Sequence, residues 1–440
     1  MAGGGPNILV VLVDDVGVDK IGVYADDADP TYRDTATRLP QTPVIDALAE
    51  RGVRFTDAWA TPSCSPTRAA LYTGRLPFRT GIGDPVETGE EGLSPDEVTL
   101  PALLSEAGYA TALFGKWHLG EGTEADDLDP HALVAEAIAL PPRDMGFEHF
   151  SGTLASLDDY YLWTRLTTTL GDRVRADPLT SYATQQTTED ALDWIADQRD
   201  RWFATVAYHA PHLPLGDPPR GCQYSLGPGE TAEDRRERHR AMVECVDQQL
   251  GELLDGAGDD TVVVFLGDNG TDESFTEGPF NDGRGKASIY ESGIRVPLIV
   301  AGPDVAQDLR IAQPVHVTDL FTTLAELGRA DSATGDDGLS IAPALLDGGT
   351  TERSWIYTEM IKQGAIQAGF RVDDHKLIIK IDHLQNAPCL RPPALYDLSV
   401  DRFEQDDLAE QEPGRVVELW DDLLEALDGE PGSWPEQPDC

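Results

Sequence analysis

The chain has 440 residues, of which 40% are hydrophobic, so it can bury a sizeable core in one large domain with a smaller companion. Its 33 basic and 79 acidic side chains give a formal net charge of -46, which argues against nucleic acid and against an anionic membrane as partners. Because only six of the basic residues are lysine, we interpret the acidic surface as halophilic, adapted to salt that screens self-repulsion; an acidic protein without that adaptation is the alternative.

The apolar run at residues 8–13 predicts a strand, because it is too short for a signal peptide or a membrane span and no basic segment precedes it. We therefore expect a cytoplasmic protein. The cysteines are odd in number, widely scattered and without Cys-x-x-Cys spacing, so they predict neither a disulfide framework nor a zinc site. They are Cys64, Cys222, Cys245, Cys389 and Cys440.

Similar apolar runs recur along the chain and predict strands that are buried on both faces of a parallel sheet. They lie at residues 110–115, 202–208, 261–267 and 297–302. Helical patterns lie between them, at 42–52, 99–108, 188–199 and 233–256. This order predicts an α/β fold, a large and mostly parallel sheet with helices on both faces.

The pattern changes after residue 345. Residues 354–360, 368–382 and 394–399 predict a small antiparallel sheet, and residues 414–429 predict a helix. We therefore expect a large α/β domain at 1–345 and a C-terminal α+β subdomain at 346–440.

Oxygen-bearing side chains follow two of the predicted strands, Asp14 and Asp15 after the first and Asp268 with Asn269 after 261–267. In open parallel sheets, ligands bind beyond the carboxyl ends of the strands, so these side chains predict one site for calcium or magnesium. The alternative is that each pair forms a turn or caps a helix.

Residues 61–75, TPSCSPTRAALYTGR, place Cys64 at the predicted start of a helix, with Ser65 as N-cap and Pro66 as first helical residue. One helical turn brings Arg68 to the face of Cys64, and free backbone N–H groups at this end favour an anion. A buried cysteine that only fills space is the alternative.

These residues resemble the signature of the sulfatase family, Cys-x-Pro-x-Arg followed by Thr-Gly-Arg, in which an enzyme oxidises the cysteine to formylglycine. Further segments resemble blocks of the same family in the same order: PNILVVLVDD, GYATALFGKWHLG, HAPHLP, GDNG, GKASIYESGIRVP and LYDLSVDRFEQDDLAE. Arg402 stands where the family commonly has proline, a position that we expect to be structural. The resemblance covers nearly the whole chain and implies an alkaline-phosphatase-like fold.

The resemblance also implies roles for individual residues. A divalent cation, calcium first and magnesium second, would be held by Asp14, Asp15, Asp268, Asn269 and the modified Cys64. Arg68 would stabilise the formylglycine hydrate, Lys116 would face the sulfate oxygens and His118 the hydrate. The ester would be bound by Lys116, His209, His212 and Lys286, of which His209 and Lys286 would also assist the leaving oxygen.

The implied activity is metal-dependent hydrolysis of sulfate monoesters of a small molecule or carbohydrate, after maturation by a formylglycine-generating enzyme. The residue types suit this chemistry, because a sulfate ester is an anion whose transition state needs cations and a metal, and a histidine can serve as general base near neutral pH. Two alternatives stay open: a phosphonate or phosphate monoester hydrolase on the same scaffold, and a non-catalytic metal- or anion-binding protein.

Overall fold

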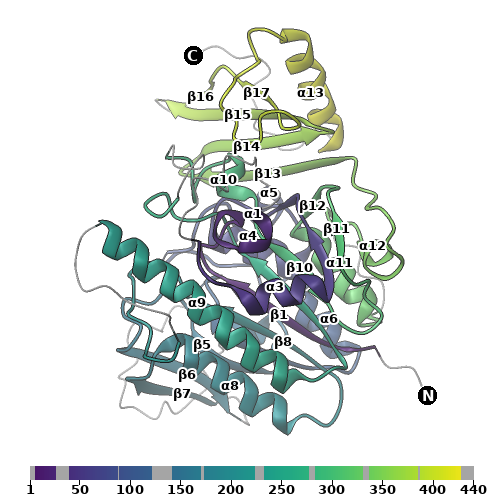
Figure 1. Ribbon diagram of the computed structural model, residues 1–440. Helices are drawn as coiled ribbons and strands as arrows, with labels where there is room; N and C mark the ends of the chain where they lie inside the picture. Colours follow the sequence, from purple (N-terminus) through teal and green to yellow (C-terminus); the bar gives the residue numbers. More distant parts are fainter. Residues whose placement is uncertain are drawn as a thin grey trace.

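The computed structural model describes residues 5–25, 39–87, 89–120, 141–169, 173–222, 232–276, 283–330, 336–384 and 387–427. A ten-stranded sheet forms the large part of the molecule, in the order β11-β2-β10-β9-β1-β8-β4-β5-β6-β7 (Figure 1). In chain order its strands are β1 Asn7–Val13, β2 Gly52–Phe55, β4 Ala110–Lys116, β5 His149–Thr153, β6 Trp163–Thr169, β7 Arg173–Leu179, β8 Trp202–Tyr208, β9 Thr261–Gly267, β10 Leu298–Ala301 and β11 Leu309–Ile311.

The centre of this sheet is parallel, as predicted, because β9, β1, β8, β4 and β5 all run in one direction. The strand expected at 297–302 differs from this pattern: β10 is antiparallel to both β9 and β2. At the other edge, β6 and β7 form an antiparallel hairpin that was not predicted. The sheet is therefore mixed but mostly parallel.

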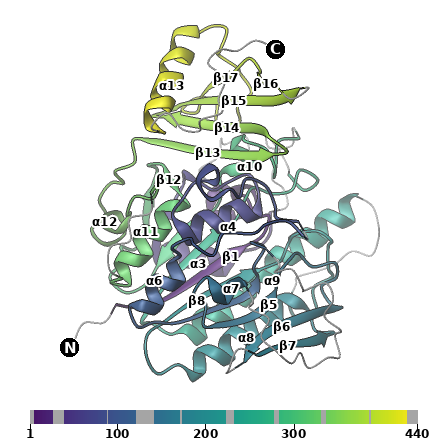
Figure 2. The same cartoon turned by 180° about the vertical axis from the view of Figure 1, so that it is seen from behind.

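Helices cover both faces of the sheet, as Figures 1 and 2 show from opposite sides. Side chains of β1 alternate between two cores, with Ile8, Val10 and Leu12 in one and Leu9, Val11 and Val13 in the other. The first core contains residues of α4 Cys64–Thr73, α6 Leu100–Glu106 and α11 Thr318–Leu327. The second contains residues of α3 Pro43–Glu50, α8 Ala183–Asp197 and α9 Ala232–Ala257.

Shorter elements connect these layers. They are the 3-10 helix η1 Val18–Lys20, the helices α1 Gly22–Ala25, α5 Pro77–Thr80, α7 Pro141–Asp144, α10 Glu291–Ile294 and α12 Ala342–Asp347, and the paired strands β3 Ala58–Trp59 and β12 Val315–His316. Among the described helices, none combines the length and the apolarity that a membrane crossing requires.

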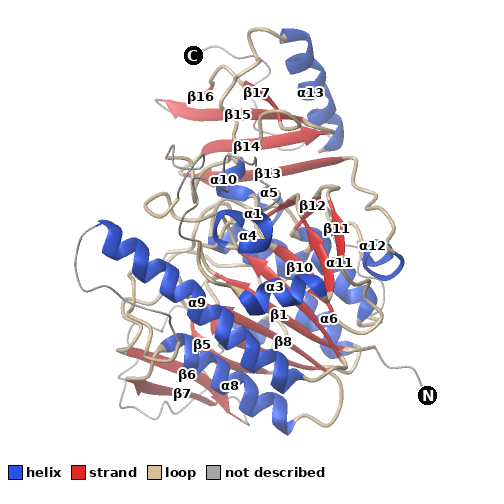
Figure 3. Cartoon of the chain, viewed as in Figure 1, coloured by secondary structure: helices blue, strands red, loops and turns tan. Residues whose placement is uncertain are grey.

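The predicted C-terminal sheet is present and antiparallel, and Figure 3 shows it with its helix at one end of the molecule. It consists of β13 Trp355–Lys362, β14 Ala365–Val372, β15 His375–Leu384, β16 Ala387–Leu390 and β17 Ala394–Asp397, followed by α13 Pro413–Ala426. Apolar side chains join it to the large part, since Trp59 and Ile289 share a core with Ile356 and Ile378. The domain boundary between residues 345 and 346 stays a prediction.

One prediction about the cysteines was wrong. Cys222 and Cys245 form a disulfide, with Cα atoms 4.6 Å apart, and Cys389 is also disulfide-bonded. The sequence could not show this pairing, because it depends on the loop after β8 folding back onto α9. The cytoplasmic location stays a prediction. The disulfide argues against it, because disulfides are rare in reducing compartments such as the cytoplasm.

Candidate active site

The candidate site lies at one edge of the large sheet, where four neighbouring parallel strands end. Asp14 follows β1, Lys116 is the last residue of β4, His209 follows β8 and Asp268 follows β9. These strands are adjacent in the order β9-β1-β8-β4. The structure therefore brings the predicted residues to the carboxyl ends of the strands, where open α/β sheets bind ligands.

Cys64 is the first residue of α4, and its N-cap is Ser63, in extended backbone with φ -149° and ψ 165°. The predicted N-cap was wrong: Ser65 lies in the first helical turn, where its Oγ accepts a hydrogen bond from the backbone nitrogen of Val86 at 3.0 Å. The Cys64 thiol donates to Oδ1 of Asp14 at 3.3 Å. Burial raises the pKa of this thiol to about 12 and Asp14 adds to the shift, so the thiol is protonated at neutral pH.

Arg68, one helical turn after Cys64, is fully buried. Its Nη1 donates to the carbonyl oxygen of Lys116 at 2.7 Å, and its Nη2 donates to Oδ2 of Asp268 at 2.9 Å. The same Nη2 lies 3.6 Å from Oδ2 of Asp14. Burial opposes the charge, but Asp268 and Asp14 raise the pKa of Arg68 above its ordinary value, so it stays a cation.

Two lysines contact the aspartates that follow β1. Nζ of Lys116 is 2.5 Å from Oδ2 of Asp14, and Nζ of Lys286 is 2.7 Å from Oδ1 of Asp15. Burial favours the neutral form of Lys286, but Cys64 and Asp15 hold its pKa well above the ordinary value. The site thus has cationic side chains from three separate segments.

The carboxyl groups of the site differ in pKa. Burial alone would raise the pKa of Asp14, but Lys116 and neighbouring cations hold it well below the ordinary value. Burial raises the pKa of Asp15 to about 6 against the effect of Lys286, and it raises the pKa of Asp268 to about 6 with help from Asp14. A bound cation would relieve the repulsion between these buried groups.

Three residues at the site have a left-handed backbone although none is glycine. They are Asp15 with φ 64°, His118 with φ 60° and Ala287 with φ 63°. Such a conformation costs about 1 kcal/mol or more and persists where the surrounding structure imposes it, which happens most often at functional sites. Asp15 and His118 each lie two residues after the end of a strand, β1 and β4 respectively.

The three predicted histidines are neutral at pH 7. Burial lowers the pKa of His118 well below its ordinary value, that of His209 to about 3 and that of His212 to about 4. Nδ1 of His118 is buried and has no hydrogen-bond partner within the described chain. Nε2 of His209 is 2.8 Å from Oγ1 of Thr153, and Nδ1 of His212 is 2.5 Å from the carbonyl oxygen of Leu213.

Two residues that the sequence analysis did not identify contact these histidines. Thr153 contacts the ring of His209, as described above, and the hydroxyl of Tyr160 donates to the carbonyl oxygens of His209 at 2.8 Å and His212 at 2.9 Å. No recognised motif surrounds Thr153 or Tyr160, and β5, which Thr153 ends, was not predicted. Only the fold reveals their roles.

The residues present fit a divalent cation. Asn269 Oδ1 is buried and lacks a hydrogen-bond partner in the described ranges, while its Nδ2 donates to Oδ1 of Asp15 at 2.8 Å. Oδ1 of Asp268 accepts from the backbone nitrogen of Asp15 at 3.1 Å. Carboxylate and amide oxygens suit calcium or magnesium. Four side chains have ligand atoms that all lie within 4.8 Å of one another: Asp14, Asp15, Cys64 and His212.

His212 was predicted to contact the substrate, and that role stays a prediction. In the structure its ring nitrogen lies within 4.8 Å of the ligand atoms of Asp14, Asp15 and Cys64, whereas the carboxylate of Asp268 is engaged by Arg68 and by the backbone of Asp15.

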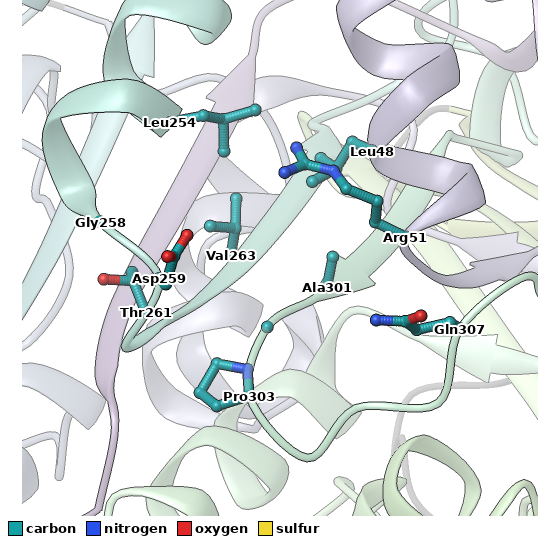
Figure 4. Close-up of a pocket in the computed structure, with 11 residues that line it drawn as sticks. Leu48, Arg51, Leu254, Gly258, Asp259, Thr261, Val263, Ala301, Pro303 and Gln307 are labelled. Carbon is teal, nitrogen blue, oxygen red and sulfur yellow. The ribbon is translucent and has the colours of Figure 1, made fainter.

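A cavity of about 250 Å³ lies elsewhere, against the start of β9 and the end of β10. Figure 4 shows Arg51 and Gln307 reaching into it from one side, with Asp259 and Thr261 on the other. Arg51, Asp259 and Gln307 are exposed, and the predicted site residues do not line this cavity. It is therefore separate from the candidate active site.

The chain is similar to known proteins in sequence and in fold. A family model described as Sulfatase matches residues 6–330. Arylsulfatase A of Homo sapiens is 28% identical to this chain over 96% of it and 86% of that protein. N-acetylgalactosamine-6-sulfatase of Sus scrofa is 30% identical over 80% of this chain and 68% of that protein. The crystal structure of Ps i-CgsB in complex with k-i-k-neocarrahexaose is similar with a TM-score of 0.78 and 25% identity, covering 98% of this chain and 95% of that chain.

Proposed function

This chain belongs to the sulfatase family and is a sulfuric ester hydrolase, and we propose that it works with a formylglycine made from Cys64 and one divalent cation. The observation that carries the proposal is the position of Cys64, which contacts Asp14 at 3.3 Å beside Lys116 and Lys286. A sulfate monoester repels ordinary nucleophiles, so its attack needs positive charge around the nucleophile. As formylglycine, residue 64 would supply a hydrated aldehyde, one hydroxyl to attack sulfur and the other, once deprotonated, to release sulfate.

The cation would be held by Asp14, Asp15, Asp268, Asn269 and residue 64, with His212 close to these groups. We propose calcium, with magnesium as the second candidate, because most of the donors are hard oxygen atoms. Bound there, the ion would neutralise charge on the sulfate oxygens. The buried, unpaired Oδ1 of Asn269 supports this assignment.

Around the nucleophile, Arg68 and Lys116 supply fixed positive charge. Arg68 cannot move freely, because both ends of its guanidinium are hydrogen-bonded. It therefore orients residue 64, while Lys116 faces the sulfate oxygens. His118 is neutral at pH 7 and its Nδ1 is free of partners within the described chain, so this nitrogen can accept the proton that residue 64 has to lose.

On the leaving-group side, His209 and Lys286 bind the ester, with His212 as a further contact. Because burial lowers the pKa of His209 to about 3, its ring is neutral at pH 7 and can contact the ester without adding charge. Lys286 stays cationic, so it is the group that stabilises negative charge on the departing oxygen.

We propose a sulfated carbohydrate or another small sulfate ester as substrate. The similarity to an N-acetylgalactosamine-6-sulfatase and to a structure holding a neocarrahexaose supports the carbohydrate. Maturation requires a formylglycine-generating enzyme in the host, and we propose no nucleic acid and no membrane as partner. Residues 121–140 and 223–231 lie outside the described residues, so this proposal assigns them no contact with the substrate.

Paired assays on an aryl sulfate and an aryl phosphonate ester test this function. Cys64→Ala should abolish turnover, and Lys116→Ala should lower kcat/KM by a factor on the order of 10² to 10³, as for the loss of one transition-state donor. The control is Lys362→Ala, since that lysine is exposed and pairs with Asp84. Faster turnover of the phosphonate would favour the alternative hydrolase, and wild-type rates in Cys64→Ala would overturn the proposal.

A further inference from the structure

The C-terminal motif at residues 395–410 has no part in the proposed chemistry, yet it reaches the segment that carries Lys286. Oε2 of Glu404, in this motif, accepts a hydrogen bond from the backbone nitrogen of Glu291 at 2.6 Å. The carbonyl oxygen of Glu404 accepts one from Nη1 of Arg284 at 2.6 Å. Arg284 and Glu291 lie on either side of Lys286, so Glu404 holds this segment at both ends.

Lys376 of β15 joins the two glutamates in a buried group, here called the Lys376 cluster (Lys376, Glu291 and Glu404). Its Nζ is 3.1 Å from Oε1 of Glu291 and 2.8 Å from Oε1 of Glu404. Each of the three side chains is at most 1% exposed. Removal of the ammonium would leave two buried carboxyl groups without their counter-charge, which is costly in a low-dielectric interior.

The ammonium of Lys376 also contacts a side chain of β3, the strand that precedes Cys64 in the chain. Nζ of Lys376 is 4.8 Å from the ring centroid of Trp59, in β3, which shortly precedes Cys64. The carbonyl oxygen of Pro62 in turn accepts a hydrogen bond from the backbone nitrogen of Ala287 at 2.8 Å. The segment that leads to Cys64 and the segment that carries Lys286 are thus joined by a backbone hydrogen bond. The first contacts Lys376 through Trp59, and the second contributes Glu291 to the Lys376 cluster.

Packing around the cluster leaves little freedom. A Cβ at Gly369 would lie 3.2 Å from Cγ1 of Ile289 and 3.4 Å from Cε of Lys376, so the glycine makes room for both. Ile289 is fully buried and shares an apolar core with Ile378 of β15 and with Leu398, which follows β17. The Lys286 segment is therefore fixed by the C-terminal sheet through charge and through packing.

From these contacts we infer that Lys376 is a positioning residue for catalysis: through Glu291 and Glu404 it fixes residues 284–294 so that Lys286 reaches the leaving oxygen. This inference rests on the role proposed for Lys286. Misplacement of a catalytic group by about 1 Å can lower a rate on the order of 10²-fold, so a distant lysine can act strongly without touching the substrate.

The test compares Lys376→Met with a matched control, Arg353→Met. Arg353 is also a buried cation, with Nε 3.0 Å from Oδ2 of Asp319 and its guanidinium 5.6 Å from the ring of Trp355, but it contacts no residue of 284–294 in the described structure. Both variants lose a buried ion pair and a ring contact. A second variant, Glu404→Ala, removes the bond to Glu291 and serves if Lys376→Met does not fold.

Measured below the melting temperature of every variant, Lys376→Met should lower kcat for an aryl sulfate about tenfold or more, and Arg353→Met less than about twofold. In a Lys286→Ala background, Lys376→Met should change kcat less than about twofold, because its effect passes through Lys286. Hydrogen exchange of amides at 284–294 should be faster in Lys376→Met and unchanged in Arg353→Met.

The inference is overturned by an equal fold-loss of kcat with and without Lys286, by equal losses in Lys376→Met and Arg353→Met, or by unchanged exchange at 284–294. If the wild-type enzyme hydrolyses no sulfate ester, the proposed function fails by itself. Hydrogen exchange then still decides whether Lys376 fixes this segment, because it requires no substrate.

Discussion

A buried carboxyl group in the C-terminal sheet should give the stability of the protein a measurable pH dependence. Glu359 of β13 is fully buried, and its carboxylate accepts hydrogen bonds from the backbone nitrogen of Phe78 at 2.7 Å and from the hydroxyl of Tyr357 at 2.7 Å. Burial raises its pKa from 4.5 to about 7, and these two hydrogen bonds only partly oppose the shift.

The sign follows from proton binding. Between pH 4.5 and about 7 the folded protein keeps the Glu359 proton that the unfolded chain has released, so the free energy of unfolding falls as pH rises. The stabilisation is complete below pH 4.5 and lost above about 7. Each pKa unit corresponds to 1.36 kcal/mol, so the loss is about 3 kcal/mol over this range.

Glu359→Gln removes the titration and keeps the shape of the side chain. Urea unfolding of both proteins at fixed salt, from pH 4.5 to 8, gives the difference in free energy of unfolding. Across this range we expect the free energy of unfolding of the variant to rise by about 3 kcal/mol relative to that of wild type. A difference in free energy of unfolding that does not change with pH, or a variant that loses stability relative to wild type as pH rises, would refute the reasoning.

Three other predictions concern the metal, the disulfide and salt. Asp268→Ala should weaken binding of calcium or magnesium by a factor of about 100 or more, whereas Glu273→Ala, a control at an exposed residue, should bind the metal normally. Stoichiometric metal in Asp268→Ala, measured by elemental analysis, would show that Asp268 is not a metal ligand. Replacement of both Cys222 and Cys245 by serine should lower the free energy of urea unfolding by about 3 kcal/mol, because the bridge closes a loop with a sequence separation of 23, and an unchanged midpoint would contradict this. With a net charge of -46, the melting temperature should rise from 0.1 to 2 M KCl while KM for an anionic ester also rises, and a flat or falling melting temperature would remove the link to a saline habitat.

Local sequence predicted the central part of the fold. Continuous apolar runs such as 202–208 have to be buried on both faces, which requires a parallel sheet with helices on each side. The direction of β10 could not be predicted, because an apolar strand of four residues has the same pattern in either direction. The hairpin β6–β7 was missed for a related reason: Arg165 of β6 pairs with Asp177 of β7 at 3.1 Å, and such polar strands lack the apolar run.

At the site, the strand-end position of the aspartate pairs and the resemblance of the Cys64 segment identified residues that the fold places close together. What they could not identify are contacts between distant segments. Tyr160 reaches the carbonyl oxygen of His209, and Lys376 reaches Glu291, with no local pattern to mark either. Arg402, expected to be structural, does contact Asp57 at 2.7 Å. The shift of the N-cap from Ser65 to Ser63 arises because the chain enters α4 from an extended segment.

The most direct test of the central claim is the mass of the peptide that contains residue 64, measured on samples whose sulfatase activity is known. Protein made with and without a formylglycine-generating enzyme provides the two samples, and the Cys64→Ala variant provides the baseline. We predict that sulfate release is proportional to the fraction of peptide in which the thiol has become an aldehyde. Full activity in protein whose peptide carries only the unmodified thiol would contradict the account.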